Sequence, residues 1–205
     1  NFDRTIAVVG SRKASEAAKT VLTKILSDFK GTDICIVSGL ALGIDSCAHK
    51  AAVNNGISTI GVIASGFDYI YPTQNKDLYK KIEDESGVIF SEYWPTFQPL
   101  QWRFPHRNRI VTGLSKGTLV AEAAIKSGAL ISANLCLEQN RELMCMPGLL
   151  TNPNTEGIYK LIKNGAAVVT RAQDILDTLD WQVETKPEKK QNPLESLDLT
   201  EDEKT

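Results

Sequence analysis

The sequence predicts one α/β domain with a doubly wound, mostly parallel β-sheet. Short runs of consecutive apolar residues recur along the chain without the alternation of a half-exposed sheet, and segments with helical spacing separate them. Strands with this pattern are buried on both faces, so helices must cover both sides of the sheet. At 205 residues, 42% of them hydrophobic, the chain is long enough for one sizeable core. The predicted class is therefore Rossmann-like, an extended Rossmann fold.

The individual elements follow in order from local patterns. The run TIAVVG is rich in β-branched residues and ends in glycine, and the helix after the second strand ends at Gly56, a typical C-terminal stop. Strands are predicted at residues 5–10, 33–39, 58–66, 87–93, 117–123 and 142–148, and helices at residues 18–29, 48–56, 76–84 and 130–139. Residues 156–170 indicate a further helix and short strand, and residues 172–181 a closing helix.

The composition narrows the class of protein. Residues 182–205 carry seven acids and four bases, which leaves residues 1–181 at a net charge of +1, so any anion binding must come from local clusters. Four cysteines lie apart without a CxxC pair, and only two histidines occur, so neither disulfides nor a metal site is predicted and a reducing cytoplasm is expected. We find no membrane span and no signal peptide, and interpret the start at Asn1 as that of an excised fragment.

The segment RFPHRNR, residues 103–109, is the most distinctive cluster. It sets three arginines and a histidine beside Phe104, and no acidic residue occurs between positions 93 and 121. Two interpretations stay open. In a structural one, Pro105 opens a helix that runs to Leu114, and Phe104 belongs to the core. In a binding one, the cations hold the backbone of single-stranded nucleic acid and the ring stacks on an unpaired base.

Small residues follow several predicted strands, at the edge of the sheet where ligands bind. Ser11, Ser38, Gly39 and Gly43 can offer backbone amides to a phosphate, although tight packing of helix on sheet explains them equally well. Arg12 projects from the first turn toward the same edge as the basic segment, and a guanidinium can hold a phosphate through two hydrogen bonds. The nucleotide motifs GxGxxG and GxxxxGK[ST] are missing, so no cofactor is predicted.

Six blocks of sequence together resemble the DNA-processing protein A family, DprA, also called Smf. They are VVGSRKAS, IVSGLALGIDSCAHKAAV, GVIASGFDYIYPTQN, FSEYWP, FPHRNRIVTGLSKGTLVAEAAIKSGALISA and NRELMCMPG. The resemblance implies a non-catalytic protein of natural transformation and homologous recombination, which binds and protects incoming single-stranded DNA and loads the recombinase RecA onto it. It also implies that the Rossmann-like domain, residues 1–181, forms a homodimer. Residues 182–205 resemble a linker toward a C-terminal winged-helix domain, which is absent here.

The resemblance further implies a positively charged pocket that holds the DNA strand. Its residues in this chain are Gly10, Ser11, Arg12, Ser38, Gly39, Leu40, Ala41, Phe104, Arg107, Asn108, Lys126, Ser127 and Gly128. Relatives often carry a lysine where this chain has Gln101. We expect Arg103 to supply the missing charge at that place.

A second function stays open, that of a nucleotide-phosphate-processing enzyme similar to phosphoribohydrolases. Glu122 lies at a strand end where a general acid or base could sit, but the PGGxGT loop of those enzymes is missing. We expect Glu122 instead to brace the basic segment through Arg107 or Arg109. Asp45 and His49, four residues apart on one helix, are expected to bond to each other. Tyr69 and Tyr71 either fill the rim of the site or touch DNA.

Overall fold

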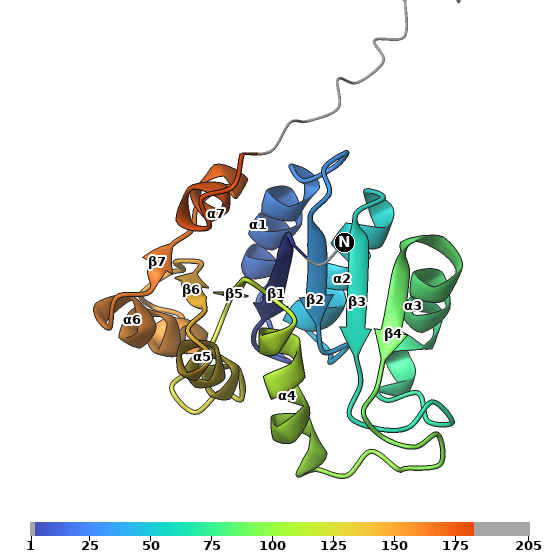
Figure 1. The fold of residues 1–205 in the computed structure, drawn as a ribbon. Helices are drawn as coiled ribbons and strands as arrows, with labels where there is room; N and C mark the ends of the chain where they lie inside the picture. The colour runs from blue at the N-terminus through green and yellow to red at the C-terminus, as the bar shows by residue number, and fades with distance from the viewer. Residues whose placement is uncertain (1–2, 183–205) are drawn as a thin grey trace, which may run out of the picture.

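The computed structural model describes residues 3–182, which form a parallel sheet between two layers of helices (Figure 1). The strands are β1 (Thr5–Val9), β2 (Cys35–Ser38), β3 (Ser58–Val62), β4 (Gly87–Phe90), β5 (Gly117–Val120), β6 (Glu142–Cys145) and β7 (Ala167–Val168). Their order in the sheet is β4-β3-β2-β1-β5-β6-β7, and every neighbouring pair is parallel. The α/β prediction is confirmed, with a sheet that is parallel throughout rather than mostly so.

Helices cover both faces of this sheet, as the continuous apolar strands predict. The helices are α1 (Glu16–Ser27), α2 (Ile44–Asn54), α3 (Lys76–Lys81), α4 (Arg103–Gly113), α5 (Ala129–Glu138), α6 (Glu156–Lys163) and α7 (Ala172–Thr178). Residues of α1, α2 and α7 pack on one face, and residues of α4, α5 and α6 on the other. Helix α3 packs against α2 beyond β3. Short helical segments lie between these elements: the 3₁₀-helices η1 (Thr73–Asn75) and η3 (Pro153–Thr155) and the π-helix η2 (Ile82–Ser86).

Local signals explain where the first helices begin and end. Helix α1 starts two residues earlier than its apolar spacing indicates because Ser15 caps it, its Oγ accepting a hydrogen bond from the Ala18 amide at 3.2 Å. Gly56 follows α2 with φ of 65°, a left-handed conformation that favours glycine, so the stop predicted there is confirmed.

The strands are shorter than their apolar runs. The runs that include β3, β5 and β6 continue past the last paired residue, and Ile63, Ala123 and Met146 beyond those ends are still buried. The apolar pattern indicates which residues are buried, whereas the hydrogen-bonded pairing of a strand ends where the neighbouring strands diverge. The extra buried residues anchor the loops that leave the carboxyl edge of the sheet.

The connection order leaves a crevice beside the central strand. The chain winds from β1 through β2 and β3 to β4, then returns to β5 on the other side of β1. The loops after β1 and β5 therefore run in opposite directions, which is where parallel sheets bind ligands. Within residues 3–182 no helix has the length and apolar character of a membrane span. The predicted linker, residues 182–205, lies outside the described residues except for Gln182.

Candidate nucleic-acid interface

A groove of about 860 Å³ opens at this switch point. Its walls are the turn after β1, the loop after β5 and the start of α4, three segments that are far apart in the sequence. Most of the predicted site residues line it, namely Gly10, Ser11, Arg12, Ala41, Gln101, Phe104, Arg107, Asn108, Lys126, Ser127 and Gly128. The tertiary fold therefore brings the predicted segments together.

The turn after β2 contributes less than expected. Ser38 and Leu40 are fully buried and line no part of the groove. The Ser38 hydroxyl donates to the Val8 carbonyl at 2.6 Å, which ties β2 to β1. Gly39 lines a small adjoining pocket of about 50 Å³, and only Ala41 of this turn reaches both cavities. Ser38 and Leu40 therefore serve the packing of this turn against the sheet and do not face the groove.

Glu122 holds the turn after β1 in place. Its carboxylate accepts hydrogen bonds from the Ser15 amide and the Asn152 side chain, both at 2.9 Å, and its carbonyl accepts from the Ser11 amide at 2.7 Å. The side chain is 1% exposed and does not line the groove. The expectation that Glu122 braces the basic segment through Arg107 or Arg109 is wrong, because the carboxyl end of β5 lies against the turn after β1 instead.

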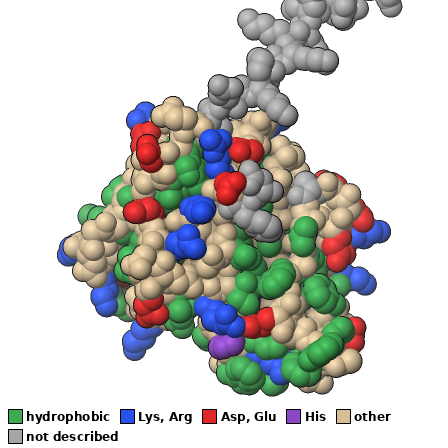
Figure 2. Space-filling model, in the orientation of Figure 1, with side chains coloured by type: hydrophobic (Ala, Val, Ile, Leu, Met, Phe, Trp, Pro, Cys, Tyr) green, Lys and Arg blue, Asp and Glu red, His purple; other side chains and the backbone are tan. Residues whose placement is uncertain are grey.

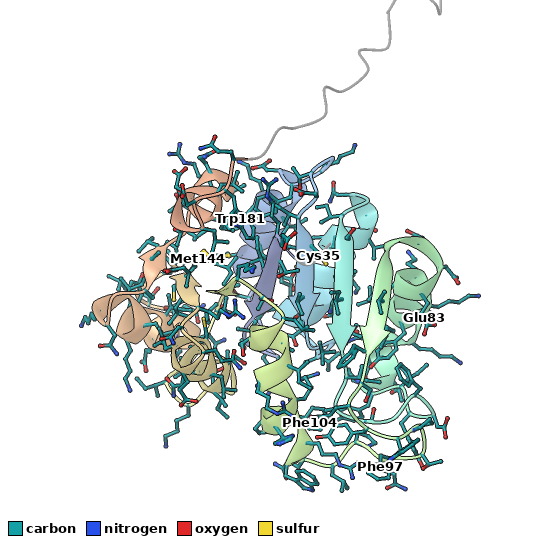
Figure 3. All side chains as sticks on the ribbon, viewed as in Figure 1. Cys35, Glu83, Phe97, Phe104, Met144 and Trp181 are labelled. Carbon is teal, nitrogen blue, oxygen red and sulfur yellow. The ribbon has the colours of Figure 1, made fainter. Side chains whose placement is uncertain are left out.

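Arg103 lies away from the groove. Its guanidinium carbon is 4.8 Å from the ring centres of Tyr93 and Phe97 and 5.2 Å from that of Trp102, and Nη1 donates to the Gln98 carbonyl at 2.6 Å. Figure 3 shows Phe97 in the loop beside the start of α4. This aromatic enclosure argues against the expectation that Arg103 replaces the lysine at position 101, because its charge is already committed to the loop.

Arg107 joins α4 to the sheet. It is 4% exposed, and its Nη1 donates to the carbonyls of Gly39, at 2.7 Å, and of Val62. Burial lowers the pKa of the guanidinium, while the charge of Asp45 opposes that shift. Arg107 forms part of the groove wall, but two strand-end carbonyls hold it there.

The remaining cations of the basic segment have an internal partner. Arg109 donates to Glu92, and His106 Nδ1 lies 3.2 Å from the other oxygen of the same carboxylate. The absence of acids near residues 103–109 in the sequence is thus misleading, because the end of β4 brings Glu92 against α4. The helix predicted by the structural interpretation does form, and it starts at Arg103, two residues before Pro105.

The cations that remain free at the groove are Arg12, Lys13 and Lys126. All three are exposed, and within residues 3–182 none takes part in an ion pair. The guanidinium of Arg12 lies 5.4 Å from the centre of the Phe104 ring, so the two side chains on which the binding interpretation depends do converge. Phe104 itself is half-buried at the start of α4 (Figure 3).

The groove lining also includes residues that were not predicted as site residues, among them Lys13, Asp45, Tyr71 and Asn154. Lys13 shares its turn with Arg12, so its place was available from the sequence. Asn154 follows β6, and only the meeting of the loops after β1 and β6 brings it there; its amide lies 3.4 Å from the Lys13 carbonyl. The groove therefore has a polar wall that sequence spacing does not reveal.

Asp45 and His49 are not bonded to each other. Asp45 Oδ2 accepts from the Ala41 amide at 3.4 Å, and burial raises the pKa of this carboxyl group. His49 Nδ1 lies 2.8 Å from the Thr59 hydroxyl, and burial lowers the pKa of the imidazole to about 3. The two side chains stabilise different parts of the fold, and only Asp45 lines the groove.

The surface over β3 and β4 differs from the groove. Hydrophobic side chains gather there beside α4 over β3 and β4 (Figure 2), where Val88 and Phe90 are 61% and 44% exposed. Neither Val88 nor Phe90 lines the groove, so this apolar area is separate from the charged groove.

Comparison with known proteins decides the family. The model of the family described as DNA recombination-mediator protein A matches residues 1–180. The chain belongs to this family. Its DprA relative from Streptococcus pneumoniae is 43% identical over 176 residues, which cover 86% of this chain and 62% of that protein. The chain thus spans about three fifths of the length of that relative.

Two solved DprA structures share the fold. The X-ray structure of DprA from Streptococcus pneumoniae superposes with a TM-score of 0.82 at 40% identity and covers 87% of this chain and 62% of that one. DprA from Helicobacter pylori, solved to describe its single-stranded DNA binding mode, superposes with a TM-score of 0.79 at 30% identity, over 87% of this chain and 82% of that one. The resemblance seen in the six blocks is confirmed.

Proposed function

We propose that this DprA-family chain binds single-stranded DNA in the groove between β1, β5 and α4. The main support for this proposal is that Arg12, Lys13 and Lys126 converge on a groove that contains the Phe104 ring. None of the three cations forms an ion pair within the described chain. Cations for the phosphates and a ring for a base are the two components of single-strand binding sites. The described binding of single-stranded DNA by the Helicobacter pylori relative supports the same ligand.

Single strands fit this groove better than a duplex. A duplex reader presents a helix whose Arg, Asn and Gln side chains reach base edges in the major groove. In α4, however, Arg103 is enclosed by rings, Arg107 binds carbonyl groups of the sheet and Arg109 binds Glu92. The free cations come from two short loops instead, which suits a flexible strand that can follow a curved path.

The wider biological role is inferred from the family and is also part of the proposal. We propose a non-catalytic recombination mediator that protects DNA entering in natural transformation and loads RecA onto it, as a homodimer in the cytoplasm. The rival role, a phosphoribohydrolase-like enzyme, would use Glu122 as its general acid or base, but both Glu122 oxygens are hydrogen-bonded and its side chain is outside the groove lining. Release of free base from nucleoside monophosphates would support the enzyme and contradict the binding module.

The decisive experiment compares DNA affinity across variants. The parent chain should bind single-stranded oligonucleotides more tightly than duplexes of the same length, and binding should weaken with salt by about −0.7 in log-log slope for each phosphate neutralised. Arg12→Ala and Phe104→Ala should each weaken binding, whereas Lys163→Ala, which removes an exposed cation at the end of α6, should not. Equal affinity for duplex, or a flat salt response, would contradict the proposal.

A further inference from the structure

We infer that Glu122 is a positioning residue for DNA binding, because it fixes the turn that presents Arg12 and Lys13 to the strand. This inference rests on the proposed binding of single-stranded DNA and gives a role in it to a residue outside the groove lining. Strand β5 lies between β1 and β6 (Figure 1), and Glu122 follows its last residue, Val120, by two positions. A side chain at this place can contact the loops that follow both neighbouring strands.

Glu122 anchors both ends of the segment that carries the two cations. Its carbonyl accepts a hydrogen bond from the Ser11 amide at 2.7 Å, and its Oε2 accepts one from the Ser15 amide at 2.9 Å. Arg12 and Lys13 lie between these two contacts, and both side chains are exposed. The backbone of the turn is therefore held at two points, while the cationic side chains stay free to reach a phosphate.

The second carboxylate oxygen ties this turn to the loop after β6. Glu122 Oε1 accepts a hydrogen bond from Asn152 Nδ2 at 2.9 Å. Asn152 Oδ1 accepts from the Asn154 amide at 3.0 Å, and Asn154 Nδ2 donates to the Lys13 carbonyl at 3.4 Å. Since Lys13 and Asn154 both line the groove, one carboxylate sets the distance between two of its walls.

A carboxylate fits between these two donors better than a neutral amide does. Each of its oxygens accepts one hydrogen bond, whereas the side chain of glutamine has one accepting and one donating end. Glu122 is 1% exposed and forms no ion pair within residues 3–182, and burial of a carboxylate without a cation is unfavourable. Packing alone does not require such a group here, so its contribution is the geometry of the two loops.

Charge and position predict opposite effects when Glu122 is neutralised. An acid near an anion-binding groove repels phosphates, so on charge alone its removal should strengthen DNA binding. Loss of the anchor instead frees the turn, which must then be ordered each time a strand binds. The sign of the change in affinity therefore separates a positioning role from an electrostatic one.

The first test is Glu122→Gln, with the affinity for oligothymidylate measured by fluorescence anisotropy. We expect the affinity to fall about 3- to 30-fold, because one of the two carboxylate hydrogen bonds becomes a contact between two donors. Glu138→Gln is the matched control, because it removes the same charge at the exposed end of α5 and should not weaken binding.

A second substitution should reverse this loss. Asn152→Asp alone should weaken binding, since it sets two carboxylates against each other. Combined with Glu122→Gln it should restore the affinity, because the glutamine amide then donates to the new carboxylate, which still accepts from the Asn154 amide. Recovery of the melting temperature without recovery of the affinity would contradict the positioning role.

A third measurement compares Arg12→Ala in the parent and in Glu122→Gln. If Glu122 positions Arg12, this substitution costs less affinity in Glu122→Gln than in the parent, because the arginine is already misplaced there. Additive losses would show that the two residues act independently and would overturn the inference. If Glu122→Gln does not fold, Asn152→Ala takes its place in this comparison with the same criterion, since it removes only the bond to Oε1.

The outcomes separate the positioning role from the groove itself. If a folded Glu122→Gln binds the strand as tightly as the parent or more tightly, the positioning role is refuted, and a loss of affinity on Arg12→Ala leaves the groove proposal standing. A parent chain that binds no strand contradicts both proposals.

Discussion

Arg12, Arg103 and Arg107 carry the same guanidinium group into three different environments. Arg12 is exposed at the groove, Arg103 is enclosed by three rings, and Arg107 is buried against the carbonyls of the strand ends. A cation contributes to the salt dependence of DNA binding only if it displaces counterions from a phosphate. The three arginines should therefore differ in what their removal does.

We predict that removing Arg12 affects DNA binding, whereas removing Arg103 affects the stability of the fold. Arg12→Ala should reduce the log-log salt slope of single-strand binding by about 0.7, the contribution of one phosphate, without lowering the melting temperature. Arg103→Ala should leave the slope unchanged but cost about 1 to 2 kcal/mol of unfolding free energy, because the cation and its ring contacts are lost. Fluorescence anisotropy at several salt concentrations and thermal unfolding measure the two effects.

Arg103→Lys is the control for that comparison, since it keeps a cation among the rings. A reduced slope in Arg103→Ala with unchanged stability would instead show that Arg103 supplies the charge missing at Gln101, as its position in the sequence suggests.

Among the elements, α7 shows how one carboxylate defines a helix start. Asp174 accepts hydrogen bonds from the Thr170 amide at 2.7 Å and from the Arg171 amide at 3.2 Å, and the bond from the Thr170 amide is the largest cause that lowers the pKa of this carboxyl group to about 2. A carboxyl pKa lower in the folded chain than in the unfolded chain stabilises the fold at pH values above the ordinary value of about 3.8.

We predict that Asp174→Ala lowers the unfolding free energy by about 1 kcal/mol at pH 7, the usual contribution of a helix cap. The difference from the parent should shrink as the pH falls from about 4 toward 2, because the parent carboxylate is then protonated. Urea unfolding at several pH values measures this. Asp177→Ala on the same helix is the control and should show no comparable loss; a pH-independent difference for Asp174→Ala would contradict the electrostatic explanation.

At the scale of the whole molecule, the two edges of the sheet differ. One edge strand is β7, where Val168 is 45% exposed, and the loop after β6 exposes Leu149 and Leu150 by 72% and 81%. The other edge strand is β4, where Val88 is 61% exposed. Exposed apolar side chains in a loop beside an edge strand suit the homodimer proposed from the family.

We predict that Leu150→Glu reduces the dimer fraction in sedimentation equilibrium and that Val88→Glu, at the opposite edge, does not. Affinity for long single strands should fall with the dimer, because two linked sites raise each other's effective concentration. Affinity for an oligonucleotide that fills one groove should stay unchanged. A parent chain that is monomeric at all concentrations, or a dimer broken by Val88→Glu alone, would contradict this assignment.

The local sequence determined the fold class and most segments of the groove. Continuous apolar strands between amphipathic helices predict a covered parallel sheet, and the turn after a strand must lie at its carboxyl edge, so Arg12 could be placed at that edge in advance. The resemblance to the family added Phe104 and Lys126 to the same site. These inferences succeed because burial and chain direction are encoded by neighbouring residues.

Only the tertiary structure decided which charges remain free. Glu92 pairs with Arg109, Glu122 holds the turn after β1, and Tyr71 meets Phe104, although none of these partners is close in sequence. Pairing between side chains depends on the distance across the folded sheet, and strand order sets that distance. The sequence thus determined where cations and rings occur, and the order of the strands decided which of them face the groove.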